Sequence, residues 1–169
     1  HEALRLTKNS RIGVIGTSVT VKSGKYGEII HSISPQTKVF SNACPMFVPL
    51  VENGYAQSEA ARLIAADYLE PLKAEGVDTL IMGCTHYPLL EGIISDIMGS
   101  GVKLVSPGAM AAKSAREYLE AQNALCEKAE GGKSEFYVSD SVENFVELGS
   151  IFLGCPLNTK VRRTEAFSE

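Results

Sequence analysis

The residues with the clearest chemical potential are Cys84, Thr85 and His86, which follow one another between two apolar segments. His86 stands two residues after Cys84, so its imidazole could take a proton from the thiol or help to keep the thiol ionised. The alternative is that Cys84 is a small buried residue and His86 a loop histidine satisfied by hydrogen bonds, because unreactive buried cysteines are common. Local chemistry alone favours neither interpretation.

The flanking segments predict that these three residues form a loop at one edge of a parallel sheet. Residues 80–82 are an apolar run typical of a strand buried on both faces. After the loop, Pro88 suits the first position of a helix. In open α/β sheets, ligands bind where a strand's carboxyl end meets a helix's amino end. Free N–H groups there favour a carboxylate ligand or a thiolate.

The remaining apolar segments predict strands and helices in alternation through residue 121. We expect strands at 11–17, 37–40, 80–82 and 102–105, and helices at 20–30, after Ser58, after Pro88 and at 109–121. This order predicts an α/β fold with a parallel, doubly wound sheet and flanking helices. Residues 1–10 read as a polar lead-in and 122–133 as an exposed linker. A strand at 135–139, a helix capped by Asp140 or Ser141, and a solvated basic tail at 160–163 complete the prediction.

Composition narrows the class of protein. With 169 residues, 44% apolar and 21% charged, the chain is typical of a globular protein. Its net charge of −4 gives no sign of a nucleic-acid surface, and no apolar run approaches a membrane span. The cysteines at 44, 84, 126 and 155 form no zinc spacing, so we expect reduced thiols in a cytoplasmic protein. No lysine stands in a context typical of pyridoxal phosphate and no metal cluster is evident, so we expect no cofactor. Because the chain opens with His1 rather than methionine, we expect a fragment.

Cys44 and Glu52 are further candidates near the ends of predicted segments. Cys44 follows the strand at 37–40 but has no histidine nearby in sequence, so a structural role is favoured. Glu52 ends an apolar run that begins at Met46. A solvated loop glutamate is the simpler interpretation, and a partner for His86 is the alternative.

Four stretches together resemble glutamate racemase, of the aspartate/glutamate racemase family. They are residues 12–17, 43–52, 83–90 and the segment from 136–140 to 152–154. They occur in the family's order, and the second and third are specific enough to make chance agreement implausible. The resemblance implies a cofactor-independent isomerase that supplies D-glutamate for peptidoglycan and cell-wall synthesis.

The resemblance also implies an arrangement of domains and residue roles. Two similar α/β domains would face each other, each giving one catalytic cysteine to the cleft between them. Cys84 would be the second-domain cysteine and would also contact substrate, while Thr85 would hold the substrate. His86 would assist the thiol and Glu52 would support the histidine, whereas Cys44 matches no catalytic position.

The chain departs from the family pattern in two ways. Ser106-Pro107-Gly108 stands where the family usually shows Asp-Ser-Gly. The whole first domain is also absent, so we expect a lead-in at 1–8, the racemase domain at 9–105, and at 106–169 a helix, linker and segment of the incomplete first domain. The chain alone would then hold one wall of the cleft and be inactive. Expected partners are glutamate and the missing domain, a second chain or a second copy, with neither nucleic acid nor membrane.

Two other functions stay open at this point. One is an aspartate-type racemase of the same superfamily, because specificity depends partly on loops that this chain lacks. The other is a non-catalytic α/β module that binds a small acid or a partner protein through its exposed face, since missing contacts would leave apolar surface open.

Overall fold

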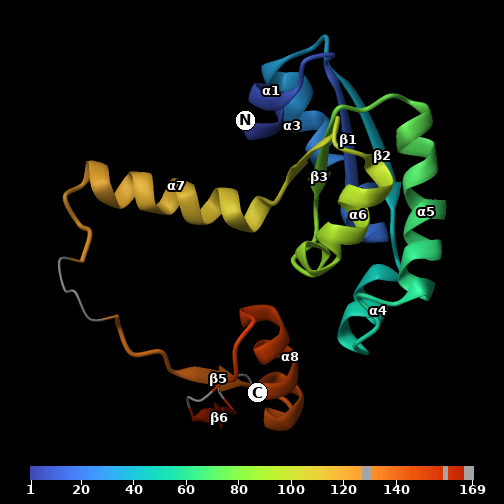
Figure 1. Ribbon diagram of the computed structural model, residues 1–169. Coiled ribbons are helices and arrows are strands. Elements are labelled where there is room, and N and C mark those ends of the chain that lie inside the picture. Colours follow the sequence, from blue (N-terminus) through green and yellow to red (C-terminus); the bar gives the residue numbers. More distant parts are fainter. Residues whose placement is uncertain (127–130, 158–159, 166–169) are drawn as a thin grey trace. The chain divides into compact units, whose positions relative to one another are not determined.

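The computed structural model describes residues 1–126, 131–157 and 160–165 and divides into two compact units (Figure 1). The first unit is His1–Ala124 and the second is Leu125–Glu169. The predicted linker at 122–133 falls partly on residues 127–130, which lie outside the described residues.

The first unit is built on a four-stranded parallel sheet in the order β2-β1-β3-β4. Its strands are β1 (Arg11–Gly16), β2 (Lys38–Ala43), β3 (Thr79–Met82) and β4 (Lys103–Val105). In the two central strands Ile12 pairs with Thr79 and Ile15 with Met82, so their carboxyl ends meet at one edge of the sheet. The predicted parallel α/β fold is confirmed.

Helices cover both faces of this sheet (Figure 1). They are α1 (Glu2–Leu6), α2 (Ser18–Lys22), α3 (Lys25–Ile33), α4 (Phe47–Glu52), α5 (Glu59–Ala74), the 3₁₀ helix η1 (Tyr87–Leu90) and α6 (Glu91–Met98). The helix α7 (Pro107–Ala121) follows β4 and extends away from the sheet (Figure 1). Successive strand residues point to opposite faces. Leu80 and Met82 therefore pack with α4, α5 and α6, while Ile81 packs with α1 and α3. This two-sided burial of β3 is what its continuous apolar run predicts.

The helix predicted at 20–30 is wrong in its bounds, because it is interrupted at Gly24. This residue has φ +65°, a left-handed conformation that glycine adopts readily. The helix α2 begins earlier than expected because the Thr17 side chain accepts a hydrogen bond from the Thr20 N–H. The result is two short helices, α2 and α3, and the second presents Tyr26 near its start.

The segment expected as a polar lead-in contains α1 and a loop held against the sheet by Asp78. The Thr7 hydroxyl donates to Asp78 at 2.6 Å, and the backbone N–H groups of Lys8 and Asn9 donate to its other oxygen at 2.6 and 2.8 Å. Ala3 of α1 is buried in the core cluster on that face of the sheet. This segment therefore packs as part of the first unit.

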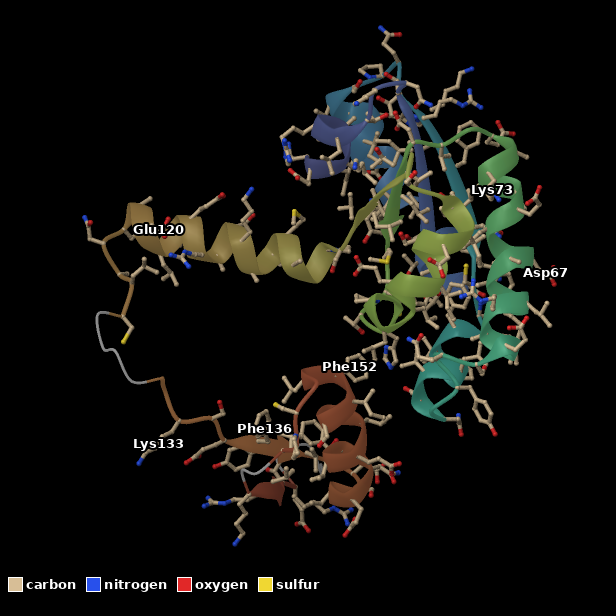
Figure 2. The ribbon with its side chains drawn as sticks, in the orientation of Figure 1. Asp67, Lys73, Glu120, Lys133, Phe136 and Phe152 are labelled. Carbon is tan, nitrogen blue, oxygen red and sulfur yellow. The ribbon has the colours of Figure 1, made fainter. Side chains whose placement is uncertain are left out.

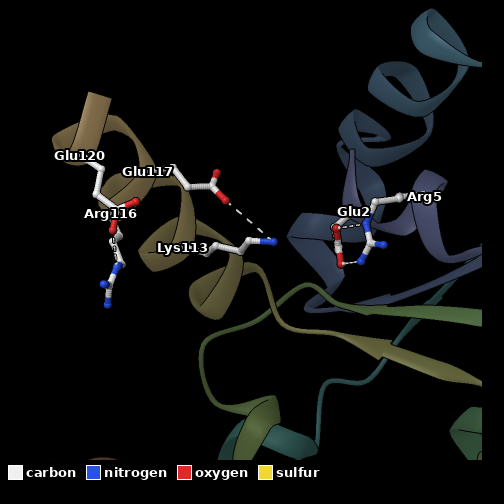
Figure 3. Close-up of polar contacts among 6 residues, drawn as sticks. All are labelled: Glu2, Arg5, Lys113, Arg116, Glu117 and Glu120. Carbon is white, nitrogen blue, oxygen red and sulfur yellow. Dashed lines mark hydrogen bonds and ion pairs between the residues drawn. The ribbon is translucent and has the colours of Figure 1, made fainter. Parts of the chain in front are cut away.

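The helix α7 packs through Met110 onto the same cluster. An apolar groove of about 460 Å³ lies between α1, α3 and α7. Two ion pairs lie on the surface of α7 at the i,i+4 spacing: Lys113 is 3.9 Å from Glu117, and Arg116 is 2.9 Å from Glu120 (Figure 3). On α1, Glu2 forms an ion pair with Arg5 (Figure 3). Exposed pairs of this kind add little stability, and none of the α7 residues is buried.

The second unit contains a parallel pair of strands, β5 (Phe136–Val138) and β6 (Val161–Arg163), and the helix α8 (Val142–Leu153). Ser141 caps α8 by accepting from the Asn144 N–H at 3.2 Å, as the sequence predicts. The basic residues of the predicted solvated tail, Lys160, Arg162 and Arg163, are exposed as expected. The tail nevertheless contains the strand β6, in which Val161 is buried and pairs with Phe136.

The helix α8 is apolar, yet none of its residues is buried in the described part of the unit. Phe136 stacks at a tilt on Phe145, with ring centroids 5.9 Å apart. Phe152 and Leu153 remain 38% and 57% exposed (Phe152 is labelled in Figure 2). The unit thus leaves apolar side chains open to a further surface.

Candidate active site

The loop that carries Cys84 is held at the carboxyl edge of the sheet by backbone hydrogen bonds. The Gly83 N–H donates to the Ile15 carbonyl of β1 at 2.7 Å, and the Tyr87 N–H donates to the Cys84 carbonyl at 3.3 Å. A Cβ on Gly83 would lie 2.9 Å from the Ile15 carbonyl oxygen, so only glycine lets the loop approach β1 this closely. Cys84 is therefore fixed where β3 ends and η1 begins, as predicted.

His86 lies between Cys84 and Glu52 and contacts both. Its Nδ1 is 4.0 Å from the Cys84 Sγ, and its Nε2 is 3.0 Å from the Glu52 Oε1. An ionised carboxylate only accepts hydrogen bonds, so Glu52 selects the ring form that carries a proton on Nε2. In the neutral ring Nδ1 is then a proton acceptor directed at the sulfur. This is the order of groups expected of an activated thiol.

Glu52 is the last residue of α4 and lies 34 positions before His86 in sequence. The simpler prediction, a glutamate bonded only to solvent, is wrong. Packing of α4 against η1 brings the carboxylate to the ring. The Glu52 side chain is 43% exposed and that of His86 is 21% exposed, so solvent screens the pair and its main effect is to orient the ring.

Thr85 is exposed beside the same ring, with its Oγ1 3.2 Å from the His86 Nδ1. A hydroxyl can donate there, which makes Thr85 and the thiol two alternative donors to one nitrogen. If a ligand oxygen or nitrogen engaged the Thr85 hydroxyl, the His86 Nδ1 would be left for the thiol proton alone. The structure thus brings together all four residues that the sequence and the resemblance single out.

Cys44 occupies a different environment. It is fully buried in the core cluster, and burial raises the pKa of its thiol to about 12. Its carbonyl accepts a hydrogen bond from the Tyr87 hydroxyl at 3.0 Å. A thiol that stays protonated and has no route to solvent cannot serve as an acid–base group, in agreement with the structural role favoured from sequence.

Cys84 and Thr85 line a cavity of about 250 Å³ together with residues of other elements that the sequence did not assign to the site. Tyr26 of α3 and Ser106 and Pro107 at the start of α7 form much of its wall. The Ser106 hydroxyl accepts from the Ala109 N–H at 3.4 Å, so it caps α7. No local pattern marks Tyr26, because only the fold brings α3 to the Cys84 loop.

Metal binding and membrane crossing can be checked over all the residues that the structure describes. Among them no group of three or more His, Cys, Asp or Glu side chains is arranged to hold a metal ion. None of the described helices combines the length and apolar character that crossing a membrane requires.

The fold and the site together define a parallel α/β protein with a thiol, an imidazole and a carboxylate in sequence at the sheet edge. Residues 1–115 match the family model described as Asp/Glu/Hydantoin racemase, and the chain belongs to this family. Among curated relatives, it is 48% identical to glutamate racemase 2 of Caldanaerobacter subterraneus subsp. tengcongensis, over 88% of this chain and 56% of the relative. Identity to the glutamate racemase of Geobacter metallireducens is 42%, over 91% and 57%.

Solved structures agree with the sequence relatives. The glutamate racemase RacE1 of Bacillus anthracis superposes with a TM-score of 0.88 at 33% identity, over 98% of this chain and 61% of that one. The enzyme of Francisella tularensis, solved with D-glutamate, gives a TM-score of 0.85 at 29% identity, over 99% and 62%. The chain therefore spans somewhat more than half the length of the proteins that it matches.

Proposed function

We propose that this chain supplies one wall of a glutamate racemase active site, with Cys84 as one of the two acid–base thiols. The observation that carries the proposal is the contact chain from the Cys84 sulfur through His86 to Glu52 at the sheet edge. Relatives that carry the name glutamate racemase, at 42–48% identity over most of this chain, support glutamate as the substrate.

Racemisation removes the α-proton of an amino acid on one face and returns a proton on the other. That proton is very weakly acidic, so a base and an acid must be held close to the carbon on opposite sides. In one direction the Cys84 thiolate takes the α-proton and becomes a thiol, while the opposing acid gives its proton to the other face. In the reverse direction Cys84 begins as the thiol and donates.

His86 would set the proton state of Cys84 before each turnover. The thiol proton passes to Nδ1, which leaves a thiolate beside an imidazolium, and the Glu52 carboxylate stabilises that cation through Nε2–H. Thr85 is exposed next to the sulfur, where its hydroxyl is available to an oxygen of the substrate carboxylate. No step calls on a cofactor.

The opposing thiol would belong to a second wall, supplied by a first domain, by another chain or by a second copy of this one. In this proposal residues 9–105 form the racemase domain that carries Cys84, and 106–169 belong with the first domain. The exposed apolar side chains of α8 support this division, since they offer a surface that such a domain would cover. The setting would be the cytoplasm, where D-glutamate is supplied for peptidoglycan.

The test is interconversion of D- and L-glutamate by two preparations of verified intact mass. One is the 169-residue chain, and the other is the complete protein that contains this sequence. We expect turnover by the complete protein and none by the chain alone. Absence of turnover by the complete protein would contradict the assigned substrate, and robust turnover by the chain alone would contradict the need for a second wall.

The family description favours aspartate as a second candidate substrate, because it names aspartate beside glutamate. Comparing kcat/KM for the two amino acids with the complete protein separates the candidates. We expect glutamate to be preferred, and a preference for aspartate would reassign the enzyme within the family.

A further inference from the structure

Tyr26 lies against the backbone that precedes the Cys84 sulfur, although it belongs to a different element of the fold. It is near the start of α3, and its ring contacts Gly83. A Cβ placed on Gly83 would be 3.2 Å from the Tyr26 Cε2 and 3.4 Å from its hydroxyl oxygen. Tyr26 and Cys84 also line the same cavity of about 250 Å³. The phenol and the thiol therefore face one small space.

The hydroxyl of Tyr26 is available as a hydrogen-bond donor in that cavity. It makes no hydrogen bond with any residue that the structure describes, and no carboxylate lines the cavity. Burial raises the pKa of Tyr26, and a negative charge on Cys84 raises it further. The phenol thus keeps its proton over the pH range in which a thiol ionises, and it can act as a donor toward negative charge.

The titratable groups that face Cys84 do not duplicate this donor. The His86 Nδ1 lies 4.0 Å from the sulfur, and Glu52 stands behind the ring. The Tyr87 phenol also has its pKa raised, by burial first and then by Cys44 and Cys84, but its hydroxyl already donates to the Cys44 carbonyl. On the far side of Tyr26, the charged residues Glu2, Lys113 and Glu117 line the separate apolar groove.

We propose that Tyr26 is a positioning residue of the Cys84 site, whose neutral hydroxyl stabilises negative charge on the sulfur across the cavity that the two side chains share. The inference rests on the proposed role of Cys84 as an acid–base thiol. It adds a third element, α3, to a site otherwise built from the β3–η1 loop and the end of α4. The expected signature is a change in how readily the thiol ionises, with no change in how accessible it is.

The test compares wild type, Tyr26→Phe and Tyr118→Phe in site-resolved alkylation by iodoacetamide between pH 6 and the high-pH plateau. Tyr118 is 67% exposed on α7 and serves as the matched phenol control. We expect Tyr26→Phe to slow alkylation of Cys84 at neutral pH by roughly three- to tenfold, because the thiolate loses one hydrogen-bond donor. The alkylation rate at the high-pH plateau should be unchanged. Cys126 and Cys155, which are exposed, are internal references in every sample.

Equal rates in Tyr26→Phe and wild type at every pH would overturn the proposal. A changed plateau rate without a shift along the pH axis would also overturn it, because it would show only a loosened loop. If Tyr26→Phe does not fold, the reciprocal measurement decides: ¹³C-labelled Tyr26 should ionise at lower pH in Cys84→Ala than in wild type, and an unchanged titration would refute the coupling. Neither measurement depends on turnover. The role of Tyr26 can therefore be refuted while glutamate racemisation is confirmed, and glutamate racemisation can be refuted while the role of Tyr26 is confirmed.

Discussion

At the scale of single residues, the chemistry depends on how His86 is held. The Glu52 Oε1 lies 3.0 Å from Nε2, and this contact leaves Nδ1 directed at the sulfur 4.0 Å away. A carboxylate does this better than a neutral acceptor, because it also stabilises the ring once a proton arrives on Nδ1. In the proposed mechanism Glu52 therefore acts through His86 as a positioning residue, without contacting the substrate itself.

The corresponding substitution is Glu52→Gln in the complete enzyme. An amide keeps the shape but loses the charge, so we expect kcat/KM for glutamate to fall roughly ten- to a hundredfold, with folding stability nearly unchanged. Racemase kinetics and thermal unfolding check the two parts. Glu59→Gln, an exposed glutamate in the first turn of α5, is the control. Equal kcat/KM in wild type and Glu52→Gln would remove Glu52 from the mechanism.

Sequence reasoning found the residues of this site that lie close together in the chain and missed those that come from other elements. Cys84, Thr85 and His86 are adjacent, and the run before them marks the strand that ends there. Glu52 was ambiguous until packing of α4 against η1 brought it to the ring. Tyr26 has no local signal at all, since a tyrosine near a helix start is compatible with many positions.

At the scale of the elements, the strand-to-helix loop tolerates no side chain at Gly83. We expect Gly83→Ala to destabilise the chain by about 1–3 kcal/mol, because its Cβ would press on the Ile15 carbonyl of β1 and on Tyr26. Urea unfolding measures the change. Gly92→Ala in α6 is the matched control, since nothing lies within 4 Å of its Cβ position, and we expect it to be neutral or stabilising.

The loop after α1 depends on the ionised form of Asp78. Partial burial alone would raise the pKa of this carboxyl, but hydrogen bonds from Thr7, Lys8, Asn9 and Thr79 outweigh that effect and lower it. A carboxyl with a lowered pKa in the folded state stabilises the protein above its unfolded pKa, and this contribution is lost as the pH falls through the folded value. The stabilisation should therefore be complete at neutral pH and decline below about pH 4.

We expect Asp78→Asn to lower the free energy of unfolding at pH 7 by about 1 kcal/mol, since this carboxylate is only partly buried and solvent screens part of the interaction. The difference from wild type should shrink as the pH is lowered below about 4. Urea unfolding at several pH values measures both. Asp67→Asn is the control, because Asp67 points outward from α5 (Figure 2). A pH-independent difference would assign the effect to packing rather than charge.

Elements with strong local signals were predicted well, and the misses have physical causes. The run at 80–82 and the Ser141 cap identify β3 and α8 directly. The interruption at Gly24 depends on a left-handed backbone that sequence permits but does not require. The strand β6 was missed because its pairing with β5 is a long-range contact, and two of its three residues are arginines that by themselves indicate solvent.

At the scale of the whole molecule, the two units differ in how much of their apolar surface they bury. The first encloses two core clusters on either side of its sheet, whereas α8 in the second has no buried residue in the part described. Local opening should therefore be far easier in α8 than in the central strands. We expect hydrogen exchange of α8 amides to be at least a hundredfold faster than that of β3 amides, as followed by mass spectrometry.

Protection of α8 equal to that of β3 in the isolated chain would contradict this expectation. It would show that the apolar side chains of α8 are already covered, by another part of the chain or by a second copy. Repeating the exchange over a range of protein concentrations separates these cases, because only association between copies depends on concentration.

The most direct test of the central claim is the effect of removing one sulfur from the complete enzyme. In Cys84→Ala, interconversion of D- and L-glutamate should fall by at least a thousandfold, because the acid–base group on one face of the α-carbon is gone. Cys126→Ala, which removes an exposed thiol of the second unit, should keep wild-type turnover. Interconversion by Cys84→Ala at the wild-type rate would contradict the account.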